Sequence, residues 1–162
     1  MKKVRLEAIT RENFNEVVNL KVADAQSNFV APNMRSIAQS KINPSLMPMA
    51  VYAGDEMVGF VLFGRDDDDG RYYLVRIMID ERQQGKGYGR AAILEVVEAF
   101  RETADCDALY LSFVPENTGA EALYKSIGFE PTGEISHGEI VMRLELENNA
   151  NPKSEIQNPK SN

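Results

Sequence analysis

The chain has 162 residues, of which 43% are hydrophobic and 27% are charged, a composition typical of a globular domain. This length can bury one hydrophobic core and is short for two domains. The formal net charge is −7, which argues against non-specific binding to nucleic acid or to an anionic membrane and favours a cationic partner only slightly.

We expect no targeting signal, and the cysteine content favours the cytoplasm. The N-terminal segment MKKVRLEAITREN has two lysines but no apolar stretch after them, so we expect no signal peptide. No apolar run reaches the roughly 20 residues of a membrane span. A single cysteine, Cys106, excludes an internal disulfide and favours a reducing compartment. We expect Cys106 to be a plain loop or strand-edge residue rather than a nucleophile.

The first half of the sequence predicts a strand, two helices and three further strands. Strands are inferred from alternating apolar and polar residues, and helices from apolar residues that recur at helical spacing. Thr10 and Asn33 are suited to cap the two helices. The last of these strands is almost continuously apolar, which favours a central place in a sheet. The predicted elements are a strand at 2–9, helices at 11–23 and 34–42, and strands at 49–53, 57–65 and 71–80.

The second half predicts two helices and three strands. Apolar residues at helical spacing from 93 to 100 predict a helix that ends near residues 103–104. A second helix is capped near Asn117 and stopped by Gly128. His137 and Gly138 join the last two strands as a hairpin. The strands of this half are predicted at 108–114, 129–136 and 139–146.

The element order is βααβββαβαββ, which predicts an α/β (α+β) fold. We expect a single mixed, mostly antiparallel sheet of about seven strands flanked by helices. Residues 1–147 are expected to form one domain, and the polar tail at 148–162 is expected to be disordered.

The segment QQGKGYGR, residues 83–90, joins the strand at 71–80 to the next helix. Glycines let the backbone approach a ligand closely, and the free N–H groups at the start of a helix attract anions. The segment therefore predicts a phosphate cradle, with Lys86 and Arg90 as additional positive charge. The alternative is a connector that only lets helix and sheet pack closely. A P-loop and a dinucleotide fingerprint both fit poorly, because the glycine spacing differs and no Ser or Thr follows Lys86.

The segment RQQGKG, residues 82–87, matches the Q/R-x-x-G-x-G/A signature of the GNAT acetyltransferase superfamily. The predicted element order and the segment NTGAEALYKSIGF, residues 117–129, also resemble that family, over residues 3–147. Within it, MIDERQQGKGYGRAA and GEIVMRL are similar to bacterial spermine/spermidine (diamine) N-acetyltransferases. The resemblance implies the GNAT acyl-CoA N-acyltransferase fold. It also implies transfer of acetyl from acetyl-CoA to a primary amine of a polyamine.

The resemblance further implies where acetyl-CoA binds. Its pantetheine arm would run beside the strand at 71–80, which must splay from the next strand, and its diphosphate would lie on the glycine turn. Tyr124 is the candidate general acid for the leaving sulfur, although helical spacing alone favours a core position. Asn117 could cap its helix, contact the cofactor, or do both. The expected cofactor-binding residues are Ile77, Met78, Ile79, Gln84, Gly85, Lys86, Gly87, Tyr88, Gly89, Arg90, Asn117 and Tyr124.

No general base emerges from the sequence. Some polyamine-acetylating relatives carry an acidic residue where this sequence has Val75 and Arg76. Asp80 and Glu81 are close in sequence to the cofactor turn, where they could act as a base or only cap the turn, and His137 is expected to lie in a solvated turn. Alkyl amines have a pKa near 10, so proton loss through water and capture of the small neutral fraction both stay open. Because no nucleophile is evident, we expect direct attack in a ternary complex.

A polyamine requires spaced carboxylates together with apolar or aromatic surface for its methylene groups. The run Asp66–Asp69 could supply carboxylates, or could simply be a solvated loop. It does not match a calcium-binding loop, and we expect no metal site. The expected substrate-binding residues are Phe29, Asn33, Asp66, Asp67, Tyr72 and Glu139.

Three other functions stay open. The chain could acetylate another small amine or a peptide N-terminus, it could be a non-catalytic acyl-CoA-binding sensor, or it could bind a nucleotide without group transfer. The family resemblance also allows a homodimer. We expect no nucleic-acid or membrane partner.

Overall fold

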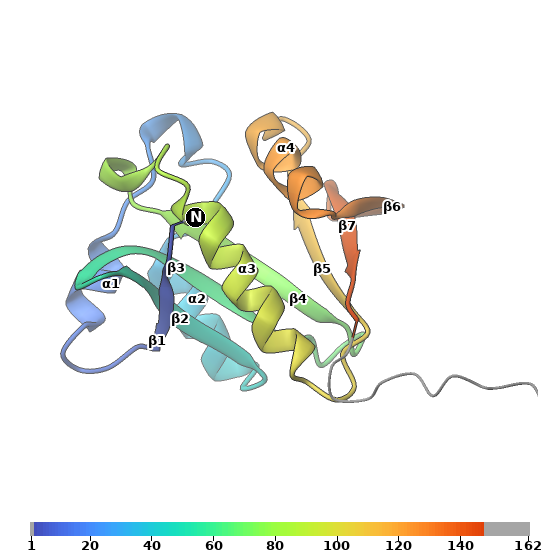
Figure 1. Ribbon diagram of the computed structural model, residues 1–162, viewed down its shortest axis with the longest axis horizontal. Helices are drawn as coiled ribbons and strands as arrows, with labels where there is room; N and C mark the ends of the chain where they lie inside the picture. The colour runs from blue at the N-terminus through green and yellow to red at the C-terminus, as the bar shows by residue number, and fades with distance from the viewer. Residues whose placement is uncertain (1, 148–162) are drawn as a thin grey trace, which may run out of the picture.

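The structure, a computed structural model, describes residues 2–147; the tail predicted at 148–162 lies outside the described residues. The described chain forms one seven-stranded sheet with helices on both faces (Figure 1). None of the helices in this range is long and apolar enough to cross a membrane. The elements are β1 (Arg5–Ala8), α1 (Phe14–Asn19), the 3-10 turn η1 (Asp24–Gln26), α2 (Asn33–Ile42), β2 (Leu46–Ala53), β3 (Glu56–Arg65), β4 (Tyr72–Ile79), the 3-10 turn η2 (Glu81–Gln83), α3 (Tyr88–Arg101), β5 (Ala108–Phe113), α4 (Thr118–Ile127), β6 (Glu130–Ser136) and β7 (Glu139–Glu145).

The strand order is β1-β2-β3-β4-β5-β7-β6, which puts β4 in the middle of the sheet. Neighbouring strands pair antiparallel except β4 and β5, which are parallel and are joined through α3. The predicted fold class, element order and central fourth strand are therefore confirmed. Antiparallel neighbours need only tight turns, whereas the one parallel pair requires a crossover helix.

Both faces of the sheet are buried. In Figure 1, α3 lies across the near face, while α1 and α2 lie behind the sheet. Strand β3 shows the consequence for the sequence, because its residues alternate between two apolar clusters. Val58, Val61 and Phe63 belong to the cluster on the α3 side, and Phe60 and Leu62 to the cluster on the α1 side. A strand covered on both faces is apolar almost throughout.

The first helix is shorter than predicted. The sequence predicts a helix over 11–23, but α1 ends at Asn19, and Leu20 is extended. The backbone of Lys21 is bound elsewhere: its N–H donates to the Asp80 carboxylate at 3.3 Å, and its carbonyl accepts from the Glu81 N–H at 2.7 Å. A residue held by a distant strand end in this way cannot continue the helical hydrogen-bond ladder.

The role predicted for Asn33 as a helix cap is wrong. Asn33 is the first residue of α2 and is buried, and Pro32 occupies the capping position. The Asn33 side-chain amide donates to the Val17 carbonyl at 2.8 Å, so it ties α2 to α1. The predicted caps of α4 are confirmed: the Asn117 side chain accepts from the Ala120 N–H at 3.3 Å, and Gly128 ends the helix with φ 114°.

The missing side chain at Gly59 lets β3 pack closely against β4. A Cβ at this position would overlap the Met78 carbonyl oxygen and lie 2.8 Å from the Ile79 side chain. We expect Gly59→Ala to lower the free energy of unfolding by about 1–3 kcal/mol, the usual range for an overpacked core. Urea denaturation measures the change. The control is Gly119→Ala in α4, where a Cβ meets nothing within 4 Å and should be neutral or slightly stabilising. Equal midpoints for Gly59→Ala and wild type would contradict this packing.

Candidate active site

A cleft opens where β4 and β5 separate. The two strands pair only at Tyr72 with Leu109 and at Tyr73 with Tyr110, and then they diverge (Figure 1). The resulting cavity has a volume of about 890 Å³, a size typical of small-molecule sites. Its walls come from β4, the 22–35 segment, the glycine turn with the start of α3, the end of β5, and α4. The separation of the strands that the sequence resemblance requires is present.

A β-bulge lies at the point of divergence. In the pairing of β3 with β4, Leu62 faces Arg76 but Phe63 faces Leu74, so Val75 is an extra residue in β4. Bulges bend a strand and redirect its side chains, and they are frequent beside active sites. Here the bulge follows the part of β4 that pairs with β5, and Val75 itself belongs to the part that lines the cleft.

The glycine turn forms one end of the cleft. Gly85 and Gly87 have φ of 73° and 87°, a left-handed backbone that strains other residues, and Gly87 is the N-cap of α3. A Cβ on Gly85 would meet nothing within 4 Å, and one on Gly87 only the Lys2 side chain at 3.8 Å. Close packing against the sheet therefore does not explain these glycines. The turn presents open space and free helical N–H groups to the cleft, which suits a diphosphate.

Asp80 anchors the start of that turn. Its carboxylate is buried and accepts from the Arg82 side chain at 2.7 Å, from the Arg82 N–H at 3.2 Å and from the Lys21 N–H at 3.3 Å. The Arg82 guanidinium, followed by the backbone hydrogen bonds, holds the pKa of Asp80 below its usual value despite its burial. The predicted capping role of Asp80 is confirmed, and its oxygens are occupied by these contacts.

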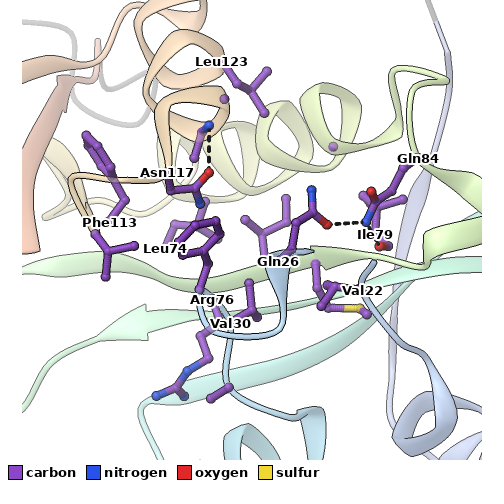
Figure 2. A pocket seen from close by; sticks show the side chains of 18 of the residues that line it. Val22, Gln26, Val30, Leu74, Arg76, Ile79, Gln84, Phe113, Asn117 and Leu123 are labelled. Atoms are coloured by element: carbon purple, nitrogen blue, oxygen red, sulfur yellow. Dashed lines mark hydrogen bonds between the residues drawn. The ribbon is translucent and has the colours of Figure 1, made fainter. Parts of the chain in front are cut away.

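The 22–35 segment is fastened over the end of β4 by two glutamines. The Gln84 amide donates to the Gln26 side chain at 2.7 Å and to the Ile79 carbonyl at 3.0 Å (Figure 2). Gln84 thus joins the glycine turn, β4 and the 3-10 turn η1. This wall brings Phe29 to the cleft.

The opposite wall is α4, which carries Tyr124. The Tyr124 ring packs near Phe113 and Phe129, with centroid distances of 5.9 and 6.0 Å, and the residue also lines the cleft. Its core position and its position at the cleft, which the sequence left as alternatives, are both observed. Burial, with a smaller effect of the Glu139 charge, raises the pKa of Tyr124 to about 12, so the hydroxyl is protonated at neutral pH.

Glu139, at the start of β7, is the carboxylate of the cleft. It accepts a short hydrogen bond from the Ser112 hydroxyl, and its charge acts on Tyr124 and on Arg76. Arg76 hydrogen-bonds Gln39 at 2.5 Å and Ser36 at 3.3 Å, on the side of β4 where α2 lies. Burial and the charge of Arg35 lower the pKa of Arg76, and Glu139 raises it.

The structure brings most of the predicted cofactor residues together. Lys86 is the exception, because it is exposed, lies outside the lining of the cleft and donates to the Gln83 side chain at 2.7 Å. Asn117 lines the cleft and caps α4 at the same time. The predicted residues that line the cleft are Phe29, Ile77, Met78, Ile79, Gln84, Gly85, Gly87, Tyr88, Gly89, Arg90, Asn117, Tyr124 and Glu139.

Several predicted substrate residues lie outside the cleft lining. Asp66 and Asp67 belong to the β3–β4 loop, where they accept from the Asp68 N–H and the Ser45 hydroxyl. Tyr72 donates to Asp105 at 2.7 Å, and its ring packs on Phe100. These residues lie near the end of β4 that pairs with β5, whereas the cleft opens towards Ile79 at the other end. Asn33 is buried between α1 and β4 and is likewise outside the lining.

Arg35, Gln26 and Ser112 line the cleft although no sequence pattern predicts them, and Arg76 lines it at a position that the sequence marks only as lacking an acid. A charged residue inside an apolar strand is a usable signal for Arg76, but nothing in the α2 sequence distinguishes Arg35.

Cys106 is buried outside the cleft lining, and burial raises its pKa to about 11. His137 is exposed in the β6–β7 turn, as predicted. Within residues 2–147, no cluster of three or more His, Cys, Asp or Glu is arranged to hold a metal ion.

Residues 14–129 match the Acetyltransferase (GNAT) family. The chain belongs to this family. It is therefore an N-acetyltransferase, and the acetyl donor of the family is acetyl-CoA, as the sequence resemblance implied. The open left-handed glycine turn and the separated edge of β4 fit that donor.

Two relatives and one solved structure illustrate the relationship. The chain is 31% identical over 150 residues to the spermine/spermidine N(1)-acetyltransferase of Bacillus subtilis (strain 168), covering 88% of this chain and 99% of the relative. It is 31% identical over 107 residues to the N-acetylaspartate synthetase of Homo sapiens, covering 65% of this chain and 35% of that protein. The spermidine N-acetyltransferase from Vibrio cholerae, solved with CoA and spermine, shares the fold with a TM-score of 0.70 at 19% identity, over 90% of this chain and 97% of that one.

Asp80 can be tested as the anchor of the cofactor turn. We expect Asp80→Ala to lower the free energy of unfolding at pH 7 by about 1–3 kcal/mol, because the N–H groups of Lys21 and Arg82 lose a buried charged acceptor. The pKa of Asp80 is lowered in the folded state, so its contribution is fully present above the unfolded pKa of about 3.9 and is lost as the pH falls through the lowered value. The deficit should therefore shrink in urea denaturation below about pH 4. Asp55→Ala, in the exposed β2–β3 turn, is the control. A deficit that does not change with pH would contradict the anchoring role.

Proposed function

We propose that the chain transfers an acetyl group directly from acetyl-CoA to a primary amine in a ternary complex. The observation that carries this proposal is the separation of β4 from β5 after two paired positions, next to an open glycine turn at the start of α3. This arrangement gives an extended ligand a strand edge to bind along and gives its anionic end a helix N-terminus.

In this proposal, the two ends of the donor are held by different parts of the chain. Gly85, Gly87 and the first N–H groups of α3 bind the diphosphate, with Arg90 beside them. The edge of β4 from Ile77 to Ile79 binds the pantetheine arm, and a backbone N–H of Met78 or a neighbour stabilises the charge that develops on the carbonyl oxygen. Acetyl-CoA supplies an activated thioester carbonyl at this point.

Tyr124 is our candidate for the proton donor. As the new N–C bond forms and the C–S bond breaks, the Tyr124 hydroxyl gives its proton to the leaving sulfur. The role is supported by the position of Tyr124 in the cleft lining and by a hydroxyl that is protonated at neutral pH. Glu139 is our candidate to hold the amine, whose excess proton leaves through water. Cys106, the single cysteine, lies outside the cleft lining, which supports direct transfer without an acyl-enzyme.

The acceptor class is the finer part of the proposal. The Bacillus subtilis relative is named for spermine and spermidine, and the human relative for N-acetylaspartate. A primary amine is what these acceptors share. The polyamine acceptor predicted from the sequence is supported by the first relative and by Glu139 as the carboxylate of the cleft.

Free-thiol release from acetyl-CoA with a panel of primary amines tests the proposal. Tight acetyl-CoA binding with no turnover on any amine would instead support the sensor.

The glycine turn can be tested separately from turnover. We expect Gly87→Glu to weaken coenzyme A binding by about 100-fold or more, because a carboxylate would fill the cradle and repel the diphosphate. Isothermal titration calorimetry with coenzyme A measures this change. Gly54→Glu is the matched control, since Gly54 also has positive φ with open space around it but lies in the β2–β3 turn. Unchanged affinity in Gly87→Glu would contradict this binding mode.

Replacing Tyr124 tests the proton donor. We expect Tyr124→Phe to lower kcat by about 100-fold with little change in stability or in coenzyme A affinity, because only the hydroxyl is removed. Steady-state thiol release measures kcat, and Tyr110→Phe on β5, outside the cleft lining, is the control. Full turnover in Tyr124→Phe would refute the acid role.

A further inference from the structure

The charge of the cleft is opposite to the charge of the chain. The formal net charge is −7, yet the charged residues that line the cleft are three arginines and one glutamate. Arg90 lies at the glycine turn, where it donates to Ser126 at 2.7 Å. The other two arginines, Arg35 on α2 and Arg76 on β4, also line the cleft, and the charge of Glu139 acts on Arg76. A surplus of positive charge therefore remains on the side where the acceptor would bind.

Arg76 is held in place by neutral groups. Its guanidinium donates to the Gln39 side chain at 2.5 Å and to the buried Ser36 hydroxyl at 3.3 Å. Figure 2 shows the Arg76 side chain running from β4 away from Asn117. The ion pairs found within residues 2–147 include neither Arg76 nor Arg35. A guanidinium group is a positively charged donor with no acceptor atom, so its favourable partner is an anion.

Arg35 and Arg76 act on each other as like charges. The charge of Arg35 is among the causes that lower the pKa of the half-buried Arg76, and Glu139 partly offsets it. An anion between the two guanidinium groups would relieve this repulsion. It would also gain charge-assisted hydrogen bonds, for which the planar guanidinium fork matches a carboxylate. A polyamine offers only cations to these arginines, which makes it the less favourable occupant.

We propose that the acceptor carries a carboxylate as well as its primary amine, and that the carboxylate binds Arg35 and Arg76 while the amine faces Glu139. The charge of Glu139 acts on both Tyr124 and Arg76. The charge of Arg35 acts on Arg76. The amine is thereby held near the proton donor and the carboxylate at the α2 side. The acceptor class is then an amino acid or a related amino carboxylate. This inference rests on the proposed acetyl transfer and narrows its acceptor.

The test compares acceptors that differ in one group. Thiol release from acetyl-CoA is measured with ω-amino acids from glycine to 6-aminohexanoate, with alkyl amines of the same length, and with diamines and spermidine. We expect the best amino acid to exceed its matched alkyl amine and diamine by at least about tenfold in kcat/KM. Arg35→Gln should lower kcat/KM for that amino acid by about tenfold or more relative to its effect on kcat/KM for the alkyl amine. The control is Arg11→Gln, an exposed arginine outside the cleft lining.

Binding provides a second readout that does not depend on turnover. In calorimetric titrations with coenzyme A present, Arg35→Gln and Arg76→Gln should weaken amino acid binding, and urea denaturation shows whether each variant is folded. Turnover of spermidine and alkyl amines with no preference for a carboxylate would overturn the carboxylate site and leave acetyl transfer intact. Amino acid binding that is unaffected in a folded Arg35→Gln variant would also overturn it. Absence of thiol release with every amine would overturn acetyl transfer, while the titrations would still decide the carboxylate site.

Discussion

The candidate active site depends on the separation of two neighbouring parallel strands, β4 and β5. β4 and β5 pair at two positions and then diverge, although both lie in the middle of the sheet. If they stayed paired along their length, their edges would satisfy each other and no ligand could bind there. The bulge at Val75 bends β4 at this point, and α4 follows directly on β5 and forms the far wall. Every residue assigned here to acetyl transfer lies in or beside this opening.

The two walls of the opening are held by different forces. On the turn side, polar contacts dominate: Asp80 fastens Lys21 and Arg82, and Gln84 fastens Gln26 and Ile79. On the α4 side, aromatic packing dominates, with Tyr124 near Phe113 and Phe129. One residue can thus belong to the core and still present its polar tip to the site, because a tyrosine has an apolar ring and a hydroxyl at its end.

The charge of the cleft differs from the net charge of the chain. The acidic surplus of the chain includes the Asp66–Asp69 run, which belongs to the β3–β4 loop and takes no part in lining the cleft. Exposed charges act over a Debye length of about 8 Å at physiological ionic strength, so charges at the other end of β4 have little influence in the cleft. The charges that an acceptor meets in the cleft are therefore those of its lining residues, three arginines and one glutamate. The overall charge of −7 is a poor guide to the acceptor for this reason.

The sequence by itself determined the order of the elements, the central fourth strand, the caps of α4 and the glycine turn. These features depend on local periodicity and on residues with special backbone preferences, such as Gly87 and Gly128, and a single segment contains all the information they need. The residues proposed to bind the diphosphate of the donor come from a motif contained in one turn, so a single segment is enough to suggest them.

The tertiary structure decided which side chains share the acceptor side of the cleft. The sequence around Arg35 in α2 does not indicate that its charge acts on Arg76 in β4. The sequence around Lys21 likewise does not indicate that Asp80 binds the Lys21 backbone just after α1 ends. Asp66 precedes β4 and Tyr72 begins it, so both lie towards the end of the strand that is away from the opening. Contacts between distant segments are set by strand register and helix packing, and only the folded chain fixes both.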